Sequence, residues 1–271
     1  MIRCRVNGGI SVISAFGGSY GSAVAVDLPF FTSVDQSGSR YSGNNAVLIL
    51  LEETDRIFKT GTKYDISIDS SIPMEMGLKS SSALALSVIV PVLKISGKQP
   101  EDNLLLRFLA GASIKAGISL TGALDDLVAC FYGGLSLCNN RDGDVIMTRK
   151  VPEELLAIAY TDRTRKSISM VDSLRSKVDN DGEILSRLVK NGRFKEAMYR
   201  NGERFSSATG QDMAAQRFLK TLSDSPVFQS GKGPALATFP GTSVRLDTTV
   251  PNGVGLIVTA LSNRGLELVE K

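Results

Sequence analysis

Residues Pro73–Ser87 read PMEMGLKSSSALALS, and the interpretation of the whole chain starts from this stretch. The preceding segment, Lys63–Asp69, alternates polar and apolar residues, a pattern that predicts a strand. The following segment, Ala83–Leu93, is an apolar run that predicts a buried helix, with a kink or an early break at Pro91. Together they predict a strand-to-helix junction made of glycine and serine.

Such a junction has the properties that bind a polyphosphate. A helix start presents unpaired backbone N–H groups and the positive end of the helix dipole. Gly77 allows the backbone to approach a ligand closely, and Lys79 adds a positive charge. The same residues are also typical of an ordinary helix N-terminus, where serine caps the first turn. The residues alone leave both interpretations open.

Composition limits the function classes. The chain has 271 residues, of which 42% are hydrophobic and 22% charged, as in a globular protein of one large domain or two modest ones. A net charge of +3 without a dense Lys/Arg tract argues against a nucleic-acid partner. The longest apolar run is too short to span a membrane and the N-terminus lacks a signal pattern, so we expect no membrane partner and a cytoplasmic location.

Two residue types limit the chemistry further. The chain has no histidine, which excludes Ser-His-Asp and Cys-His catalysis and histidine-bound metals. Its three cysteines, Cys4, Cys130 and Cys138, form no C-x-x-C pair, so we expect neither a disulfide framework nor a thiolate zinc site. Proton transfer therefore falls to carboxylates, lysines, tyrosines or the substrate itself.

Strand and helix patterns alternate irregularly, which favours a two-layer α+β fold over a doubly wound parallel sheet. Strands are predicted at Ile2–Val6, Ile10–Ile13, Ser22–Val26, Phe31–Val34, Lys63–Asp69, Leu135–Asn139, Val145–Thr148, Leu155–Tyr160, Ala235–Phe239, Ser243–Leu246 and Gly255–Leu261. Helices are predicted at Asn44–Lys59, Ala83–Leu93, Pro100–Lys115, from Asp126 to Gly133, and at Ile168–Val178, Glu183–Lys190, Phe194–Thr209 and Met213–Ser223. A boundary near Arg149–Pro152 divides the chain into domains 1–150 and 151–271.

Two further stretches carry chemistry. Thr121–Asp126 (TGALDD) leads into a helix that ends at Gly133-Gly134. Its two acids either stabilise the helix start or act on a substrate, one accepting a proton and the other helping to hold Mg²⁺. Gln229–Ala235 (QSGKGPA) is a turn before an apolar strand. Neither a Walker A motif nor a G-x-G-x-x-G after a strand is present, which disfavours a P-loop kinase and a nicotinamide dehydrogenase.

In this order the three stretches resemble the motifs of the GHMP small-molecule kinases (galactokinase, homoserine kinase, mevalonate kinase and relatives). P-x-x-x-G-L-x-S-S-x-A looks like their second motif, the acidic helix start like the segment that carries their proposed catalytic base, and QSGKGPA like their third motif. The first motif matches poorly, since the chain reads RVNGGIS at Arg5–Ser11. Lys79 and the Asp125-Asp126 pair are most similar to the archaeal shikimate kinases, a subgroup of the family.

The resemblance implies a fold and an activity. The fold is the two-layer GHMP kinase fold, with an ATP-binding N-terminal domain like ribosomal S5 domain 2 and a ferredoxin-like C-terminal domain. The activity is transfer of the ATP γ-phosphoryl group to the 3-hydroxyl of shikimate, in chorismate and aromatic amino acid biosynthesis, with ATP and Mg²⁺ as cofactors. The alternatives are another acceptor (homoserine or mevalonate) and a non-catalytic sensor on the same fold.

The resemblance also implies roles for individual residues. The implied catalytic residues are Asp126, ranked first by its spacing to Gly133, with Asp125 and Lys79. The implied ATP-binding residues are Pro73, Met74, Glu75, Met76, Gly77, Leu78, Lys79, Ser80, Ser81, Ser82, Ala83, Gly231 and Gly233. Acceptor binding is expected from Ser119, Thr121, Arg163 and Arg165. Lys115 stands near the place of the family's Mg²⁺-binding Glu, so the metal ligands expected instead are Ser81, Ser82 and Asp125.

Overall fold

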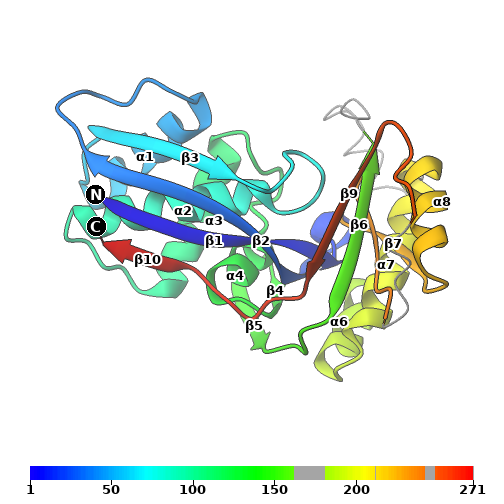
Figure 1. Ribbon diagram of the computed structural model, residues 1–271. Coiled ribbons are helices and arrows are strands. Elements are labelled where there is room, and N and C mark those ends of the chain that lie inside the picture. The colour runs from blue at the N-terminus through cyan, green and yellow to red at the C-terminus, as the bar shows by residue number, and fades with distance from the viewer. Residues whose placement is uncertain (162–180, 211, 242–247, 271) are drawn as a thin grey trace.

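The computed structural model describes residues 1–161, 181–210, 212–241 and 248–270. In this part of the chain, two antiparallel sheets lie side by side, each covered by helices (Figure 1). The expected α+β class is therefore confirmed. The predicted helix at Ile168–Val178 and the predicted strand at Ser243–Leu246 lie outside the described residues.

The larger sheet has six strands and the order β10-β1-β2-β4-β5, with β3 also paired to β2. Its strands are β1 (Ile2–Ile13), β2 (Tyr20–Gln36), β3 (Tyr64–Ser70), β4 (Leu135–Asn139), β5 (Asp144–Arg149) and β10 (Glu267–Glu270). The long strand β2 pairs with β3 through its second half and with β4 through its first half. The predicted β4–β5 hairpin and the predicted strand at Lys63–Asp69 are confirmed to within one residue.

The first 36 residues differ from the prediction of four short strands with tight turns at the glycines. They form two long strands, and Gly8-Gly9 lies inside β1 beside an irregularity in the register between Asn7 and Gly9. The glycines are needed for close approach, because a Cβ at Gly8 would lie 2.9 Å from the Leu78 backbone oxygen. A glycine pair in a strand thus marks a crowded backbone here and not a turn.

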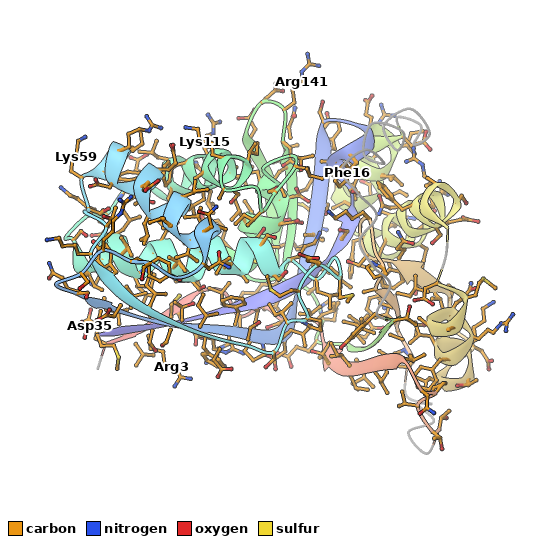
Figure 2. The ribbon with its side chains drawn as sticks, turned by 90° about the horizontal axis from the view of Figure 1, so that it is seen from above. Arg3, Phe16, Asp35, Lys59, Lys115 and Arg141 are labelled. Atoms are coloured by element: carbon orange, nitrogen blue, oxygen red, sulfur yellow. The ribbon has the colours of Figure 1, made fainter. Side chains whose placement is uncertain are left out.

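Four helices cover one face of the larger sheet, while Arg3 points from its other face (Figure 2). These helices are α1 (Asn45–Phe58), α2 (Ser80–Ile95), α3 (Asp102–Lys115) and α4 (Leu124–Tyr132). Helix α1 begins at the Asn44 cap, whose side chain accepts from two backbone N–H groups. It ends at Lys59 in the left-handed conformation.

Helix α2 does not break at Pro91 and continues to Ile95. A proline inside a helix costs about 3 kcal/mol. Val92 and Leu93 are buried beyond it, and burying an aliphatic side chain contributes about 1.5–3 kcal/mol. Burial against the sheet therefore outweighs the local penalty, and the expected early break is wrong.

The smaller sheet has four strands in the order β7-β8-β6-β9. Its strands are β6 (Leu155–Thr161), β7 (Val227–Gln229), β8 (Leu236–Thr238) and β9 (Val254–Ala260), and its helices are α6 (Gly182–Lys190), α7 (Phe194–Thr209) and α8 (Met213–Leu222). Strands β7 and β10 are absent from the prediction, because each is only three or four residues long.

The two sheets share one apolar core. Buried side chains of β1 and α2, such as Ile10 and Leu86, belong to the same cluster as Ile158 of β6 and Phe228 of β7. After β9 the chain returns to the larger sheet, where β10 pairs with the start of β1. The domain boundary near residue 150 stays a prediction.

Candidate active site

The loop between β3 and α2 has an unusual backbone. Glu75, Gly77 and Lys79 all have positive φ angles, of 67°, 82° and 66°. Lys79 occupies the cap position of α2 without a side-chain capping bond, and the first turn contains no acid. The helix therefore begins with backbone N–H groups and serine hydroxyls, and no carboxylate of its own offsets the positive end of the dipole.

Contacts with the turn at residues 229–235 hold this loop in place. Ser230 Oγ donates to the Gly77 backbone oxygen at 2.8 Å, and the Ala235 backbone N–H donates to the Met76 oxygen at 3.2 Å. A Cβ at Gly77 would lie 2.5 Å from the Ser230 backbone oxygen, so only glycine fits. The structure thus brings two stretches together that are about 150 residues apart.

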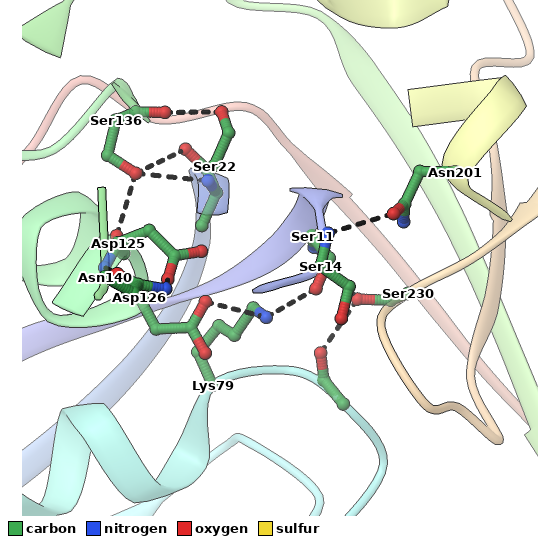
Figure 3. A network of polar contacts seen from close by, with 12 residues as sticks. Ser11, Ser14, Ser22, Lys79, Asp125, Asp126, Ser136, Asn140, Asn201 and Ser230 are labelled. Carbon is green, nitrogen blue, oxygen red and sulfur yellow. Dashed lines mark hydrogen bonds and ion pairs between the residues drawn. The ribbon is translucent and has the colours of Figure 1, made fainter. Parts of the chain in front are cut away.

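Lys79 joins the loop to α4. Its Nζ lies 2.8 Å from Asp126 Oδ1 and donates to Ser11 Oγ at 2.5 Å (Figure 3). The side chains of Lys79 and Asp126 are only 8% and 16% exposed. In this low-dielectric setting the ion pair is screened less than a surface pair, and it orients both groups. Ser11 N–H in turn donates to Ser230 Oγ at 3.1 Å, which links all three stretches.

Asp125 and Asp126 have different surroundings although they are neighbours. Successive residues of a helix point about 100° apart, so one carboxylate faces Lys79 and the other faces the protein interior. Asp125 is only 3% exposed and accepts a hydrogen bond from Asn140 Nδ2 at 2.7 Å. A Cβ at Gly21 would lie 2.5 Å from its carboxyl carbon, so β2 closes over it.

Burial raises the pKa of Asp125 to about 7, and the charge of Asp126 adds to this effect. Lys79 and the hydrogen bond from Asn140 act in the opposite direction. Because the cost of desolvation dominates, the buried carboxyl holds its proton at mildly acidic pH. Asp125 is therefore suited to holding α4 in position, and Asp126 to meeting a ligand.

Further hydrogen bonds hold the start of α4. Ser136 Oγ donates to the Asp125 backbone oxygen at 2.8 Å, and Ser22 Oγ donates to the Ser136 backbone oxygen. Asn140 N–H donates to the Ser19 oxygen at 2.7 Å. The β4–β5 hairpin and β2 thus clamp the helix start from two sides (Figure 3).

The predicted site residues fall into groups. Of the predicted ATP-binding residues, Met74 and Glu75 are exposed; Pro73, Met76, Gly77, Lys79 and Ser81 are half-buried; and Leu78, Ser80, Ser82, Ala83, Gly231 and Gly233 are buried. Ser119 and Thr121 are half-buried in the loop before α4, and their side chains form no hydrogen bond with Lys79 or Asp126. Arg163 and Arg165 lie outside the described residues.

Sequence reasoning missed Ser11, Asn140 and Ser136 as members of this network. Ser11 belongs to the poorly matching first motif, and Asn140 directly follows the predicted strand Leu135–Asn139. Both reach the site through strand pairing that joins distant segments. A buried serine in an apolar strand, such as Ser136 between Leu135 and Leu137, was the available signal.

Comparison with known proteins identifies the family of the chain. The family model described as "GHMP kinases N terminal domain" matches residues 44–134. A curated relative from Thermoplasma acidophilum, named shikimate kinase, is 30% identical over 265 residues, covering 97% of this chain and 96% of that protein. The chain belongs to the GHMP kinase family. A second relative of this GHMP kinase, from Pyrococcus abyssi and also named shikimate kinase, is 28% identical over 85% of the chain and 88% of that protein.

Solved structures confirm the GHMP kinase fold. The Methanococcus jannaschii mevalonate kinase matches with a TM-score of 0.73 at 14% identity, covering 96% of this chain and 98% of that one. The homoserine kinase from Cytophaga hutchinsonii matches with a TM-score of 0.70 at 17% identity, covering 99% of this chain and 97% of that one. Membership of a kinase family implies ATP and a small-molecule substrate. No helix among the described residues of this GHMP kinase is long and apolar enough to cross a membrane.

Proposed function

We propose that the chain transfers the γ-phosphoryl group of ATP to the 3-hydroxyl of shikimate, as the name of its curated relatives suggests. The observation that carries the proposal is the Lys79–Asp126 pair, which lies where the starts of α2 and α4 meet. It puts a carboxylate and a cation next to a helix start suited to phosphate.

The start of α2 is the proposed phosphate site. Its uncapped first turn supplies backbone N–H donors, and Ser81 adds a half-buried hydroxyl. The proposed role of Lys79 is to contact the transferring phosphoryl group, where its charge stabilises the transition state more than the ground state. Gly77 and the turn at 229–235 keep the loop in the shape that this binding needs.

Asp126 is the proposed base. It accepts the proton of the acceptor hydroxyl as the hydroxyl oxygen forms a bond to the γ-phosphorus. The bond between that phosphorus and the bridging oxygen breaks, and ADP leaves with the electron pair. Because phosphoryl transfer depends mainly on positioning and electrostatics, orienting the hydroxyl is the larger part of this role.

The residues present fit a bound Mg²⁺ in a limited way. Among the described residues, no three acidic or cysteine side chains are arranged so that together they could hold a metal ion. Mg²⁺ is commonly bound by one or two protein ligands together with nucleotide phosphates. Ser82 and Asp125 are buried, so Ser81 is our choice among the three predicted ligands. When bound, Mg²⁺ offsets negative charge on the phosphates.

The finer expectations remain proposals: contacts of Ser119, Thr121, Arg163 and Arg165 with the acceptor, and a cytoplasmic location. The test of the function is Mg²⁺- and ATP-dependent release of ADP, with shikimate, homoserine and mevalonate as separate acceptors. Release with shikimate alone is the expected result. Release with only another acceptor would overturn the substrate, and ATP binding without release for any of the three would favour a sensor.

A further inference from the structure

One face of α7 carries polar groups that lack partners. Asn201 is only 2% exposed, and its Oδ1 accepts a hydrogen bond from the Ser14 backbone N–H at 2.9 Å. A backbone N–H can only donate, so this bond fixes the orientation of the amide. The other end, Nδ2, is a buried donor without a hydrogen-bond partner in the described part of the chain.

Arg204 follows one turn later on the same helix, and residues three apart share a helix face. Its Nη2 atom is likewise buried and without a hydrogen-bond partner among the described residues. Nη1 pairs with Asp181 Oδ2 only at 3.8 Å, beyond the range of a hydrogen bond. The side chain as a whole is 21% exposed.

Two buried donors without hydrogen-bond partners on one face of a helix indicate a missing partner. Leaving a buried donor unsatisfied costs about 1–3 kcal/mol, and more when the group is charged. An amide N–H and a guanidinium N–H both point to an acceptor, and the charge of Arg204 favours an anion. A carboxylate and a phosphate oxygen are the two chemistries that satisfy both donors.

The position of these donors favours a carboxylate. Ser14 follows three residues after Ser11, which accepts from Lys79 Nζ, and three residues of strand span about 10 Å. In Figure 3, Asn201 lies on one side of Ser11 and Ser14, and Lys79 and Asp126 lie on the other. A small cyclic acid reaches this far with a hydrogen bond at each end, its hydroxyl at Asp126 and its carboxylate at α7.

We propose that Asn201 Nδ2 and Arg204 Nη2 bind the carboxylate of the acceptor. The proposal rests on the proposed function, since it takes the acceptor to be a hydroxy acid such as shikimate. It gives α7 a direct part in choosing the substrate. Phe16 from the β1–β2 turn packs edge-to-face on Phe205 of α7, with ring centroids 6.3 Å apart, and holds this face against the turn. Figure 2 shows Phe16 on this side of the molecule.

The test compares shikimate with its methyl ester, which keeps the hydroxyls and lacks the negative charge. Asn201→Asp keeps an oxygen for Ser14 N–H and replaces the free donor with an acceptor. Arg204→Met removes the charge. For each variant we expect kcat/KM with shikimate to fall about 10- to 100-fold, since a charge-assisted hydrogen bond contributes about 1.5–3 kcal/mol. Activity with the ester and the KM for ATP stay within about twofold, so the preference for the acid disappears.

Arg200→Met is the matched control. Arg200 lies on the same helix, 55% exposed, and pairs with Glu196, so its loss removes one positive charge without touching the proposed site. We expect the ratio of kcat/KM for the acid to kcat/KM for the ester to be the same in Arg200→Met as in the unaltered protein. If Asn201→Asp does not fold, as judged by circular dichroism, Arg204→Met carries the test, because its side chain is partly exposed.

Three results would overturn the proposal. Equal losses with acid and ester would show a purely structural role, and a raised KM for ATP in place of the acceptor would assign the donors to nucleotide phosphate. If the unaltered protein phosphorylates none of the acceptors, the proposed function is wrong, but the subsite can still be tested by binding. Calorimetric binding of acid and ester then decides: equal affinity overturns the subsite, and a preference for the acid that Arg204→Met abolishes supports it.

Discussion

The starts of α2 and α4 are built alike and charged differently. Each follows a residue in the left-handed conformation, Lys79 with φ 66° and Ala123 with φ 45°, and neither has a side-chain cap. The first turn of α4 contains two acids, Asp125 and Asp126, whereas the first turn of α2 contains none. The positive end of α4 is therefore balanced by its own carboxylates, and that of α2 is left for an external anion.

This difference separates two tasks within one site. In the proposed mechanism the start of α2 meets the ligand with N–H groups, and the start of α4 meets it with a base. The Lys79–Asp126 pair joins the two. Helix α1 provides the contrast, because its Asn44 side chain accepts from Ala46 N–H and Val47 N–H and satisfies the helix start internally.

Removing the proposed base at the start of α4 should have the largest effect. Asp126→Asn is expected to lower kcat by about 10²- to 10⁴-fold, the usual contribution of a general base. The dissociation constant for ATP, measured by calorimetry, should change little, because the proposed phosphate site lies at α2. Asp144→Asn, at an exposed carboxylate on β5, is the control. Nearly full turnover by Asp126→Asn would mean that the acidic helix start is structural.

Changing the α2 loop should act on ATP binding and on stability together. Gly77→Ala places a methyl group 2.5 Å from the Ser230 oxygen at a residue with φ of 82°. We expect a loss of at least about 2 kcal/mol of unfolding free energy, because a left-handed alanine alone costs about 1–2 kcal/mol. Weaker ATP binding should accompany it.

Gly97→Ala separates the two causes in this experiment. Gly97 has φ of 67°, and a Cβ there would meet nothing within 4 Å. It should show the backbone penalty alone, in urea unfolding, with ATP binding unchanged. If Gly77→Ala and Gly97→Ala lower the unfolding free energy and ATP binding equally, the contact with Ser230 does not contribute to the effect of Gly77→Ala.

The buried acid of α4 makes stability depend on pH. The pKa of Asp125 is raised to about 7, above the ordinary value of about 3.9, so the folded state binds the proton more tightly than the unfolded state. Its contribution to stability is present below about pH 4 and is lost as the pH rises towards 7. Asp125→Asn keeps an oxygen for Asn140 and removes the titration.

The measurement is the difference in unfolding temperature between Asp125→Asn and the unaltered protein. This difference should shift in favour of the variant, by a few degrees, between pH 4 and pH 8. A difference that stays constant across this range would show that the Asp125 carboxyl does not take up a proton on folding.

The capped helix should show the smallest effect. Asn44→Ala removes the two hydrogen bonds to the start of α1 and is expected to cost about 1 kcal/mol of unfolding free energy. kcat and the affinity for ATP should stay the same. A drop in kcat would mean that α1 contributes to the active site. The contrast between a capped structural helix and the two uncapped helices of the site would then be wrong.

The sequence revealed local features well and long-range ones poorly. The helix at Phe194–Thr209 was predicted to the residue, whereas the ranking of Asp126 over Asp125 stays a prediction. Spacing along one helix carries that information. The partnership of Lys79 with Ser11 depends on how β1 lies against the loop, and no local pattern of residues encodes it.

The wrong or missing predictions also come from contacts between distant segments. Gly8-Gly9 has the composition of a turn, and only the approach of the Leu78 backbone shows why glycine is needed in a strand. Asn201 looks like any polar residue of an amphipathic helix, and only its buried, half-satisfied amide distinguishes it. In both cases the decisive contact joins segments that lie far apart in the sequence.

Strand β10 has a consequence for any attempt to divide the molecule. It comes after the smaller sheet in the chain, yet it covers Ile2–Arg5 of β1. A fragment that stops near residue 150 would lack this cover, and the backbone N–H and C=O groups of Ile2–Arg5 would form an open edge. Open edges recruit further strands, so such a fragment would self-associate even with its own helices in place. The part of the chain before residue 150 thus depends on Glu267–Glu270 to cover this edge of its sheet.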